Sequence, residues 1–516
     1  MSKVKDAYKE IEGIVGSDYI TDKDFMKAAY SRNVDPAFPD RWADMIVRPE
    51  SAEEISDIVK IANKYKIPMV PRGGGADLVG GSVTQGGILF DLTRMNRILE
   101  VNEDDFYCVV ECGITWGNLV SQLHKRGLTT GVLGPGSGYS ATVGGGLSNS
   151  TAGFGSTKYG LVPDICLGVE VVLPDPQGTI INTGAGASKY AKPFCRYGVA
   201  PDFTGLFMGD VGTMGIKTKA SLKLFPDSPI KVRRDYILNK NNYQKAFELL
   251  KEIRRELSPG LTDAIVIPHP VIKVLQGMAK EKPEKRARLK GSVFMVGLEA
   301  FDQRVMDVYL EKLDEIMTKD DACRPFEYQE IDLSEPLAKD WKFNLQFAFQ
   351  YFNKYISIVP DTISCTTCHK IPISYIPEAE TLSHKFDQRF RAEFPDKSIS
   401  LFATVIYLLP NGNCVFVGGF NAYNTEDQQP IAMNMWHKKL RAQVRYGGVH
   451  YWLGESISQS IVEAGAYTPE FAKFFKDMKK IVDPNFLLSP QKFHMHSYDD
   501  DMLKHEIEDE PYDQVE

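Results

Sequence analysis

The sequence has no apolar run approaching the roughly 20 residues that span a bilayer. Its first residues, Met1 to Asp6, are polar and unlike a signal peptide. These two features predict a cytoplasmic protein. The net charge is −8 and no basic stripe stands out, which argues against nucleic acid as a partner. The composition, with 43% hydrophobic and 25% charged residues, is typical of a globular protein, and 516 residues suffice for two or three domains.

The eight cysteines are scattered along the chain, which argues against a disulfide framework. Cys365, Cys368 and His369 match the C-x-x-C-H pattern of covalent haem attachment. Without an export signal, haem attachment is disfavoured. Two interpretations stay open: a chance pair in a loop, or a metal or iron–sulfur site with ligands from elsewhere.

Glycine, by contrast, is abundant in the first half of the chain. The most informative segment is residues 71–81, Pro-Arg-Gly-Gly-Gly-Ala-Asp-Leu-Val-Gly-Gly, between two apolar runs. Three consecutive glycines can turn the backbone so that several N–H groups face one concave side, where they bind a phosphate or pyrophosphate. The segment therefore predicts a phosphate-bearing cofactor, and the alternative is a glycine-rich hairpin turn.

Two further glycine-rich segments follow, residues 134–160 and residues 205–216. Glycine and small polar residues dominate the first, as in a flexible linker. Strong strand patterns flank it, however, and this favours a backbone that wraps closely around a ligand.

After Pro226 the glycine clusters end. Helical patterns at residues 243–257 and 302–318 alternate with a strand at 292–298 and a hairpin at 404–417, which predicts an α+β domain. Residues 497–516 carry nine Asp or Glu and predict a solvated tail.

The chain resembles the flavoprotein family of vanillyl-alcohol oxidase and p-cresol methylhydroxylase, which includes glycolate oxidase and D-lactate dehydrogenase FAD subunits. The resemblance covers about residues 40–225 and 470–493. It is carried by four elements in order: the Arg72 loop, Thr142 to Gly145, Lys158 to Gly160, and Gly205 to Ile216. The segment 483–492 looks like the family's closing motif, with Gln491 in place of glycine.

The resemblance implies an α+β fold: a two-lobed FAD-binding domain with N-terminal helices over residues 1–225, and an α+β cap over 226–470. Residues 471–496 would return to the FAD domain, followed by the tail 497–516. The residues that the resemblance implies for FAD binding are Arg72, Gly73, Gly74, Gly75, Ala76, Asp77, Pro135, Gly136, Thr142, Gly144, Gly145, Asn149, Gly153, Tyr159, Gly160, Gly215, Ile216 and Lys492.

The subfamily is open. The surroundings of Tyr107 and of Arg196 resemble the phenol-oxidising branch, whereas the Arg72 loop resembles the hydroxy-acid branch. That branch carries H-x-G-D-G-N-x-H and G-E-H-G signatures. Here the nearest matches are residues 409–414, without histidine, and Gly448 to Tyr451, which keeps only His450. No metal is therefore predicted.

For catalysis, His450 is the candidate base, because histidine titrates near neutral pH. Tyr451 and Tyr107 are its candidate hydrogen-bonding partners, and Arg196 is a candidate anchor for a carboxylate or phenolate. The alternatives are a structural histidine and a surface ion pair.

Three functions remain open. The first is an FAD-dependent dehydrogenase of an alcohol or 2-hydroxy acid, which passes electrons to a partner such as an electron-transfer flavoprotein or an iron–sulfur subunit. The second is a phenol-type oxidase or hydroxylase acting on a 4-alkylphenol or benzylic alcohol. The third is a flavin-binding structural subunit of a redox complex. A homo-oligomer is compatible with each.

Overall fold

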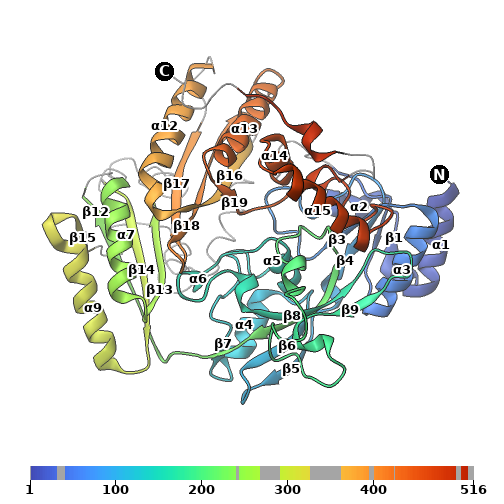
Figure 1. The fold of residues 1–516 in the computed structure, drawn as a ribbon, viewed down its shortest axis with the longest axis horizontal. Coiled ribbons are helices and arrows are strands. Elements are labelled where there is room, and N and C mark those ends of the chain that lie inside the picture. The colour runs from blue at the N-terminus through green and yellow to red at the C-terminus, as the bar shows by residue number, and fades with distance from the viewer. Residues whose placement is uncertain are drawn as a thin grey trace.

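The computed structural model describes residues 2–31, 41–239, 243–267, 291–325, 362–393, 400–423, 425–495 and 501–509. Two units lie next to each other, an N-terminal unit with two sheets and a cap with one large sheet (Figure 1). This arrangement confirms the predicted α+β fold class.

The first lobe is a four-stranded sheet in the order β1-β2-β4-β3, packed against two helices. Its elements are β1 (Ile20–Thr21), β2 (Met45–Val47), β3 (Met69–Arg72), β4 (Ile88–Asp91), α1 (Ser2–Val15) and α3 (Ala52–Tyr65), with α2 (Asp24–Ser31) between α1 and β2. Helix α3 begins at Ala52 because the Ser51 side chain accepts a hydrogen bond from the Glu54 N–H at 3.1 Å. Its buried stripe of Ile55, Ile58 and Val59 faces the lobe's core.

The second lobe is a five-stranded antiparallel sheet in the order β5-β6-β10-β8-β9. The strands are β5 (Ile98–Asn102), β6 (Tyr107–Glu111), β8 (Cys166–Val172), β9 (Ile180–Asn182) and β10 (Ile216–Lys223). The helices of this lobe are α4 (Trp116–His124), α5 (Val143–Ser148) and α6 (Ser156–Tyr159), and the short strands β7 (Leu128–Thr129) and β11 (Phe225–Pro226) pair with each other.

The chain returns to the first lobe near its end. Leu488 forms a parallel bridge with Met69 on the free edge of β3, after helices α14 (Glu455–Glu463) and α15 (Pro469–Val482). The buried Lys479 fixes this return by donating to Asp483 at 2.6 Å and to the Leu488 carbonyl at 3.0 Å.

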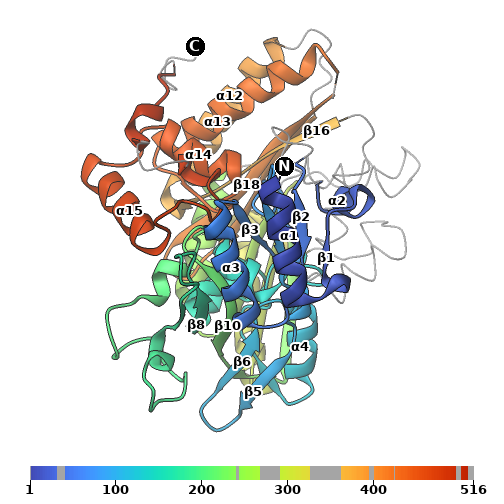
Figure 2. The same cartoon turned by 90° about the vertical axis from the view of Figure 1, so that its right-hand side faces the viewer.

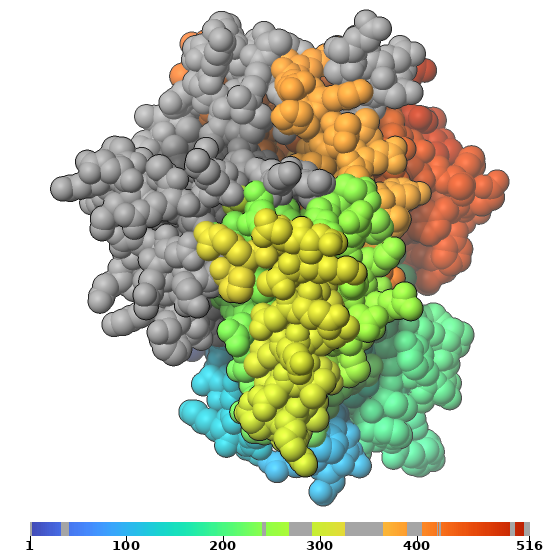
Figure 3. Space-filling view, turned by 90° about the vertical axis from the view of Figure 1, so that its left-hand side faces the viewer, coloured from blue at the N-terminus to red at the C-terminus, as the bar shows by residue number. Residues whose placement is uncertain are grey.

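The cap is an eight-stranded sheet in the order β15-β12-β14-β13-β17-β18-β16-β19. Its strands are β12 (Ile230–Leu238), β13 (Leu261–Ile267), β14 (Val293–Ala300), β15 (Cys323–Pro325), β16 (Thr362–Pro372), β17 (Ser400–Leu408), β18 (Asn413–Tyr423) and β19 (Val449–His450). Its helices are α7 (Tyr243–Leu257), α9 (Gln303–Thr318), α12 (Ile376–Glu393) and α13 (Gln428–Arg445), of which α7 and α9 form the outer surface in Figure 3.

The two faces of the cap sheet have different neighbours. Alternate residues such as Phe294, Ile406 and Phe416 pack under the helices. The intervening residues, among them Tyr407 and Val415, contact Ala152 and Leu161 of the N-terminal unit. We call the first the helix face and the second the FAD-domain face.

The acidic tail differs in part from the prediction. Residues 501–509 dock on the cap, because Asp509 accepts hydrogen bonds from Arg441 at 2.6 and 2.8 Å and from Arg445 at 2.7 Å. These charge-assisted hydrogen bonds, together with the Arg441–Glu463 pair at 3.1 Å, hold this part of a charged segment against α13. The rest of the predicted tail, 497–500 and 510–516, lies outside the described residues.

Candidate functional site

The first glycine loop offers a row of unpaired donors. The backbone N–H groups of Gly73, Gly74, Gly75 and Ala76 meet no acceptor in the part of the chain that the structure describes. A Cβ added at Gly74 would lie 1.6 Å from the Ser140 carbonyl oxygen. Side chains are therefore excluded, and the loop keeps free N–H groups of the kind that hold a phosphate.

The side chains of Arg72 and Asp77 contact the loop and the residues that follow it, rather than its open side. Arg72 Nη1 donates to the Ser82 carbonyl at 3.2 Å, and a Cβ at Gly75 would lie 2.1 Å from Arg72 Nη2. Asp77 accepts hydrogen bonds from the Gly81 N–H at 2.7 Å and from Ser82 Oγ at 2.6 Å. Both predicted cofactor residues thus fix the loop's shape, and the guanidinium adds positive charge beneath it.

The second glycine-rich segment forms the adjoining wall. Thr142 caps α5 by accepting from the Gly145 N–H at 3.3 Å, and its Oγ1 lies 2.1 Å from where a Cβ of Gly73 would be. A Cβ at Gly144 would lie 2.9 Å from Cys112 Cβ. The first and second segments therefore touch through atoms that only glycine leaves room for.

This wall continues with one unsatisfied polar atom. Asn149 Oδ1 is buried and has no hydrogen-bond partner among the described residues. A Cβ at Gly153 would lie 1.7 Å from the Gly134 carbonyl oxygen, so residues 151–156 run tightly along 131–136, which include the half-exposed Pro135 and Gly136. A buried amide oxygen without a donor calls for a ligand group to complete it.

Lys492 closes the loop from the far end of the chain. Its fully buried ammonium donates to the Gly80 carbonyl at 2.9 Å and lies 3.7 Å from Glu455, which also accepts from Arg41 at 2.7 Å. The closing motif therefore contacts the backbone of the glycine loop directly, and the predicted contact of Lys492 with FAD stays a prediction.

These residues fit FAD. The free N–H groups at 73–76 match a pyrophosphate, and the orphaned Asn149 oxygen matches a donor of the flavin or ribityl part. Both features lie on segments joined by the Gly73–Thr142 contact.

Four other residues predicted to bind FAD have structural contacts instead. Tyr159 donates to Glu299 of the cap at 2.5 Å, beside Lys158 at 2.7 Å. Gly160 has φ +86° and abuts Asp164, where a Cβ would lie 2.4 Å from Oδ2, and a Cβ at Gly215 would lie 2.3 Å from Val171 Cγ1. Ile216 pairs with Val172 in the sheet and is fully buried in the first lobe's core. Tyr159 thus joins the cap to the FAD domain, Ile216 packs in the first lobe, and Gly160 and Gly215 allow close backbone approach. The role of these four residues in FAD binding stays a prediction.

His450 lies on the helix face of the cap sheet, which corrects its predicted role as the base. It pairs with His369, whose ring contacts Phe416 and whose Nε2 is hydrogen-bonded to Tyr446. Directly paired residues project from the same face of a sheet, so the His450 ring points away from the FAD domain. Burial lowers the pKa of His450 from 6.5 to about 4, which leaves a neutral imidazole of low basicity.

Tyr451 lies on the opposite side from His450. Its hydroxyl accepts from the Ala152 N–H at 2.6 Å and donates to the Ala152 carbonyl at 3.2 Å. Burial raises the pKa of Tyr451, so the phenol stays neutral. The predicted pairing of Tyr451 with His450 is therefore replaced by a contact between the cap and the second glycine-rich segment.

Tyr107 and Arg196 are also placed away from His450. Tyr107 lies on β6 and donates to Glu100 at 2.7 Å, and β6 and β19 belong to different sheets (Figure 1). Arg196 forms a bidentate pair with Asp202, at 2.8 Å from Nη2 and 3.0 Å from Nε, and donates to the Pro163 carbonyl at 2.8 Å. Their predicted catalytic roles are corrected, because both side chains already have partners far from the cap.

The C-x-x-C-H motif is not a haem site. Cys365 packs with Trp436 and Phe420 on one face of β16, whereas Cys368 packs with Val415 and Tyr451 on the other. Residues three apart in a strand point to opposite faces, so the two thiols cannot bind one group. Burial raises the pKa of the Cys368 thiol well above its ordinary value.

Sequence reasoning missed four polar residues on the FAD-domain face. Asp263 on β13 accepts from the Gly155 N–H at 2.9 Å and from the Tyr407 hydroxyl, which also donates to the Gly153 carbonyl at 2.6 Å. On β16, Thr366 has a buried hydroxyl without a hydrogen-bond partner, and Lys370 lies on the same face as Cys368. The alternation of side chains along the strands could have placed these four residues on one face. It could not have shown that this face points toward the FAD domain.

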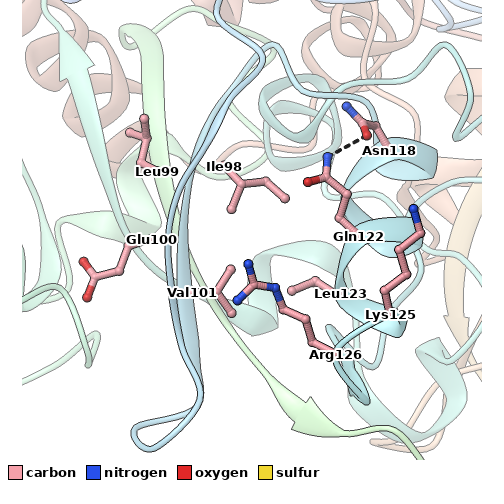
Figure 4. Close-up of a pocket in the computed structure, with 9 residues that line it drawn as sticks. All are labelled: Ile98, Leu99, Glu100, Val101, Asn118, Gln122, Leu123, Lys125 and Arg126. Atoms are coloured by element: carbon pink, nitrogen blue, oxygen red, sulfur yellow. Dashed lines mark hydrogen bonds between the residues drawn. The ribbon is translucent and has the colours of Figure 1, made fainter.

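A separate cavity of about 610 Å³ lies between β5 and α4 (Figure 4). Ile98 and Val101 face it from the strand, Gln122 faces it from the helix, and Arg126 faces it from the residues just after the helix. It lies on the outer side of the second lobe, and neither the glycine loop nor the cap contributes to it. In the described ranges no group of three or more His, Cys, Asp or Glu side chains is arranged to hold a metal ion.

The sequence and the fold are similar to those of known proteins. Residues 43–184 match the family model of an FAD binding domain. The glycolate oxidase subunit GlcD of Bacillus subtilis is 33% identical over 223 residues, which are 43% of this chain and 45% of that protein. The chain thus spans less than half the length of this relative.

Two solved structures cover nearly the whole fold. The 4-ethylphenol oxidase of Gulosibacter chungangensis superimposes with a TM-score of 0.79 and 19% identity over 95% of this chain and 97% of that one. The p-cresol methylhydroxylase superimposes with a TM-score of 0.78 and 17% identity over the same shares of the two chains.

A two-lobed domain with a backbone cradle for FAD, covered by a large antiparallel sheet, defines a two-domain flavoprotein. Residues 43–184 are similar to an FAD binding domain, and the fold of the whole chain is that of p-cresol methylhydroxylase and 4-ethylphenol oxidase. Within the described residues, no helix combines the length and apolar character of a membrane span.

Proposed function

We propose that the protein is an FAD-dependent dehydrogenase that oxidises a small alcohol or 2-hydroxy acid and passes the electrons to a partner protein. The observation that carries the proposal is the row of unpaired N–H groups at Gly73 to Ala76, within a matched FAD-binding domain. FAD, when bound, accepts the hydride from the substrate carbon. The relative named as a glycolate oxidase subunit supports both the substrate class and a partner.

Lys370 favours a substrate with a carboxylate. It is half-buried on the FAD-domain face of β16, and burial lowers its pKa, with Asp164 acting against the shift. No ion pair of Lys370 occurs among the described residues. A partly desolvated cation is stabilised by an anion, so a substrate carboxylate at this position gains a charge-assisted contact.

A phenolic substrate is the second candidate. Around Cys368 the FAD-domain face is apolar, with Leu409, Val415 and Trp452. An aromatic ring fits such a lining better than a small hydroxy acid does. The structural neighbour named as a 4-ethylphenol oxidase supports this alternative at the level of the fold.

Anaerobic stopped-flow reduction of the flavin by 2-hydroxy acids and by 4-alkylphenols tests the two candidates. We expect reduction by at least one hydroxy acid. We expect Lys370→Met to weaken binding of that acid about 10-fold or more, the scale of a charge-assisted hydrogen bond, whereas Lys370→Arg keeps most of the affinity. Lys125→Met removes an exposed lysine at the outer cavity and serves as the control.

Other outcomes of the flavin-reduction experiment distinguish the remaining candidate functions. Reduction by phenols alone would reject the hydroxy-acid proposal in favour of the second candidate. If no substrate reduced a bound flavin, the third possibility, a structural flavin-binding subunit, would gain support. A protein that cannot take up FAD would reject all three.

A further inference from the structure

The segment between β9 and β10 exposes more large apolar side chains than any comparable stretch of the described chain. Tyr190 is 86% exposed and Tyr197 67%, and the others are Phe194, Val199 and Phe203. Single exposed apolar residues need no explanation, but a group of five within 14 residues marks an interaction surface.

This segment is held in place from below. The Ala185 N–H donates to the Cys195 carbonyl at 2.8 Å, and Ser221 Oγ donates to the Pro193 carbonyl at 2.6 Å. The Arg196–Asp202 pair joins its two halves. The aromatic side chains therefore project from a fixed backbone, so their exposure is a property of the fold.

The charge of the segment is opposite to that of the whole chain. Lys189 and Lys192 are exposed and form no ion pair within the described residues, whereas Arg196 and Asp202 neutralise each other. The chain as a whole has a net charge of −8. Lysines interleaved with Tyr and Phe suit a surface that is both anionic and apolar just below its charged layer.

Helix α15 extends this surface. Its Phe474 and Ile481 are 61% and 70% exposed, next to Lys473 and Lys480 in the sequence. The helix and the segment at 189–203 lie on the same side of the molecule, since both are on the near side in Figure 1 and at the left in Figure 2. Two elements far apart in the sequence, both with exposed aromatic side chains and lysines, thus lie on one side of the molecule.

We propose that residues 189–203, together with the outer side of α15, dock the protein on an anionic lipid bilayer. Tyr and Phe side chains enter the headgroup region, and Lys189 and Lys192 contact the lipid phosphates and carboxylates. A second copy of the chain is a poorer occupant, because a two-fold contact brings the same positively charged patch against itself. This inference is independent of the substrate.

Vesicle co-sedimentation of the FAD-loaded protein tests the proposal. We expect binding to phosphatidylcholine vesicles that contain phosphatidylserine, weaker binding to pure phosphatidylcholine, and a loss at high salt. The double variant Lys189→Gln and Lys192→Gln should lower the partition coefficient about 30-fold, because each lysine near an anionic surface contributes a factor of slightly more than about five. Tyr190→Ser with Tyr197→Ser should reduce binding to both kinds of vesicle.

The matched control is Phe301→Ser with Val308→Ser. Phe301 and Val308 are 64% and 62% exposed. Phe301 lies just before α9 and Val308 lies within it, and α9 forms part of the outer surface of the cap (Figure 3). We expect this variant to bind vesicles like the unchanged protein. Circular dichroism and flavin content should match in all variants.

Three outcomes would overturn the proposal. They are no binding to anionic vesicles, binding that the segment variants leave unchanged, and concentration-dependent dimerisation that these variants abolish without any vesicle binding. The last result would assign the surface to a second copy. Binding to an acidic protein alone, with none to vesicles, would equally reject a lipid surface.

Discussion

The two walls of the candidate site are built in different ways. The FAD-domain wall is made of backbone, with Gly73, Gly74 and Gly153 packed so closely that a methyl group would collide with a neighbouring chain. The cap wall is made of side chains that alternate between two faces of one sheet. On the FAD-domain wall, the type of residue decides whether the cofactor can approach the backbone. On the cap wall, the direction of each side chain decides whether it can contact the substrate.

This difference changes which residues matter. On the glycine wall the contacts are fixed by close approach and leave little room for substitution. On the cap, His450 and Tyr451 are neighbours in sequence yet serve opposite faces. Four changes would break or sharpen this contrast, in decreasing order of expected effect.

The largest effect is expected for Gly153→Ala. Its Cβ would lie 1.7 Å from the Gly134 carbonyl oxygen, so one backbone segment must move. We expect a destabilisation of more than about 3 kcal/mol and loss of flavin, because overpacking against backbone cannot be relieved by a side-chain rotation. Thermal unfolding and the flavin-to-protein absorbance ratio measure both.

The control for that change is Gly13→Ala in α1, where no atom would lie within 4 Å of the added Cβ. It should retain flavin. Equal damage by the two substitutions would show that close packing does not define the glycine wall.

The second effect concerns acid stability. The pKa of His450 is about 4 in the folded protein and about 6.5 when unfolded, so the unfolded state binds more protons between these values. Stability is thus unaffected above pH 6.5 and falls as the pH drops toward 4, by about 3 kcal/mol for this group. His450→Gln should flatten this decline in urea unfolding midpoints without slowing flavin reduction.

The matched control is His384→Gln, which removes an exposed histidine from α12 of the cap. A large loss of flavin reduction rate in His450→Gln would contradict its placement on the helix face and restore it as the base.

A third, smaller effect is expected for Lys492→Met. The change leaves the Gly80 carbonyl without its donor and Glu455 with Arg41 as its remaining cation. The cost of an unsatisfied buried acceptor is about 2 kcal/mol, and we expect it in weaker FAD binding, measured by titration of the apoprotein. Lys480→Met, on the exposed side of α15, is the matched control, and equal affinity in both variants would refute the link.

The smallest effect is expected where prediction and structure differ most. Tyr107→Phe and Arg196→Ala should each change the rate of flavin reduction less than about twofold, because their partners Glu100 and Asp202 lie within the second lobe. Stopped-flow reduction with the best substrate measures this. A decrease of about 100-fold, the scale of a lost catalytic group, would return them to the active site.

The sequence indicated much of the fold through local rules. Ser51 is a typical helix N-cap and precedes α3, and the hairpin predicted at residues 404–417 forms within β17 and β18. Residues 483–492 resemble the family's closing motif. It could not reveal the ordered end at 501–509, because Arg441 is far away in the chain and its charge selects Asp509 only after folding.

The sequence by itself determined the cofactor, because phosphate recognition here uses backbone N–H groups and only glycine leaves them accessible. It did not determine which side chains meet the substrate. A shift of one residue in a strand moves every side chain to the other face. Only the tertiary structure decided that Lys370 and Tyr451, rather than His450, face the FAD domain.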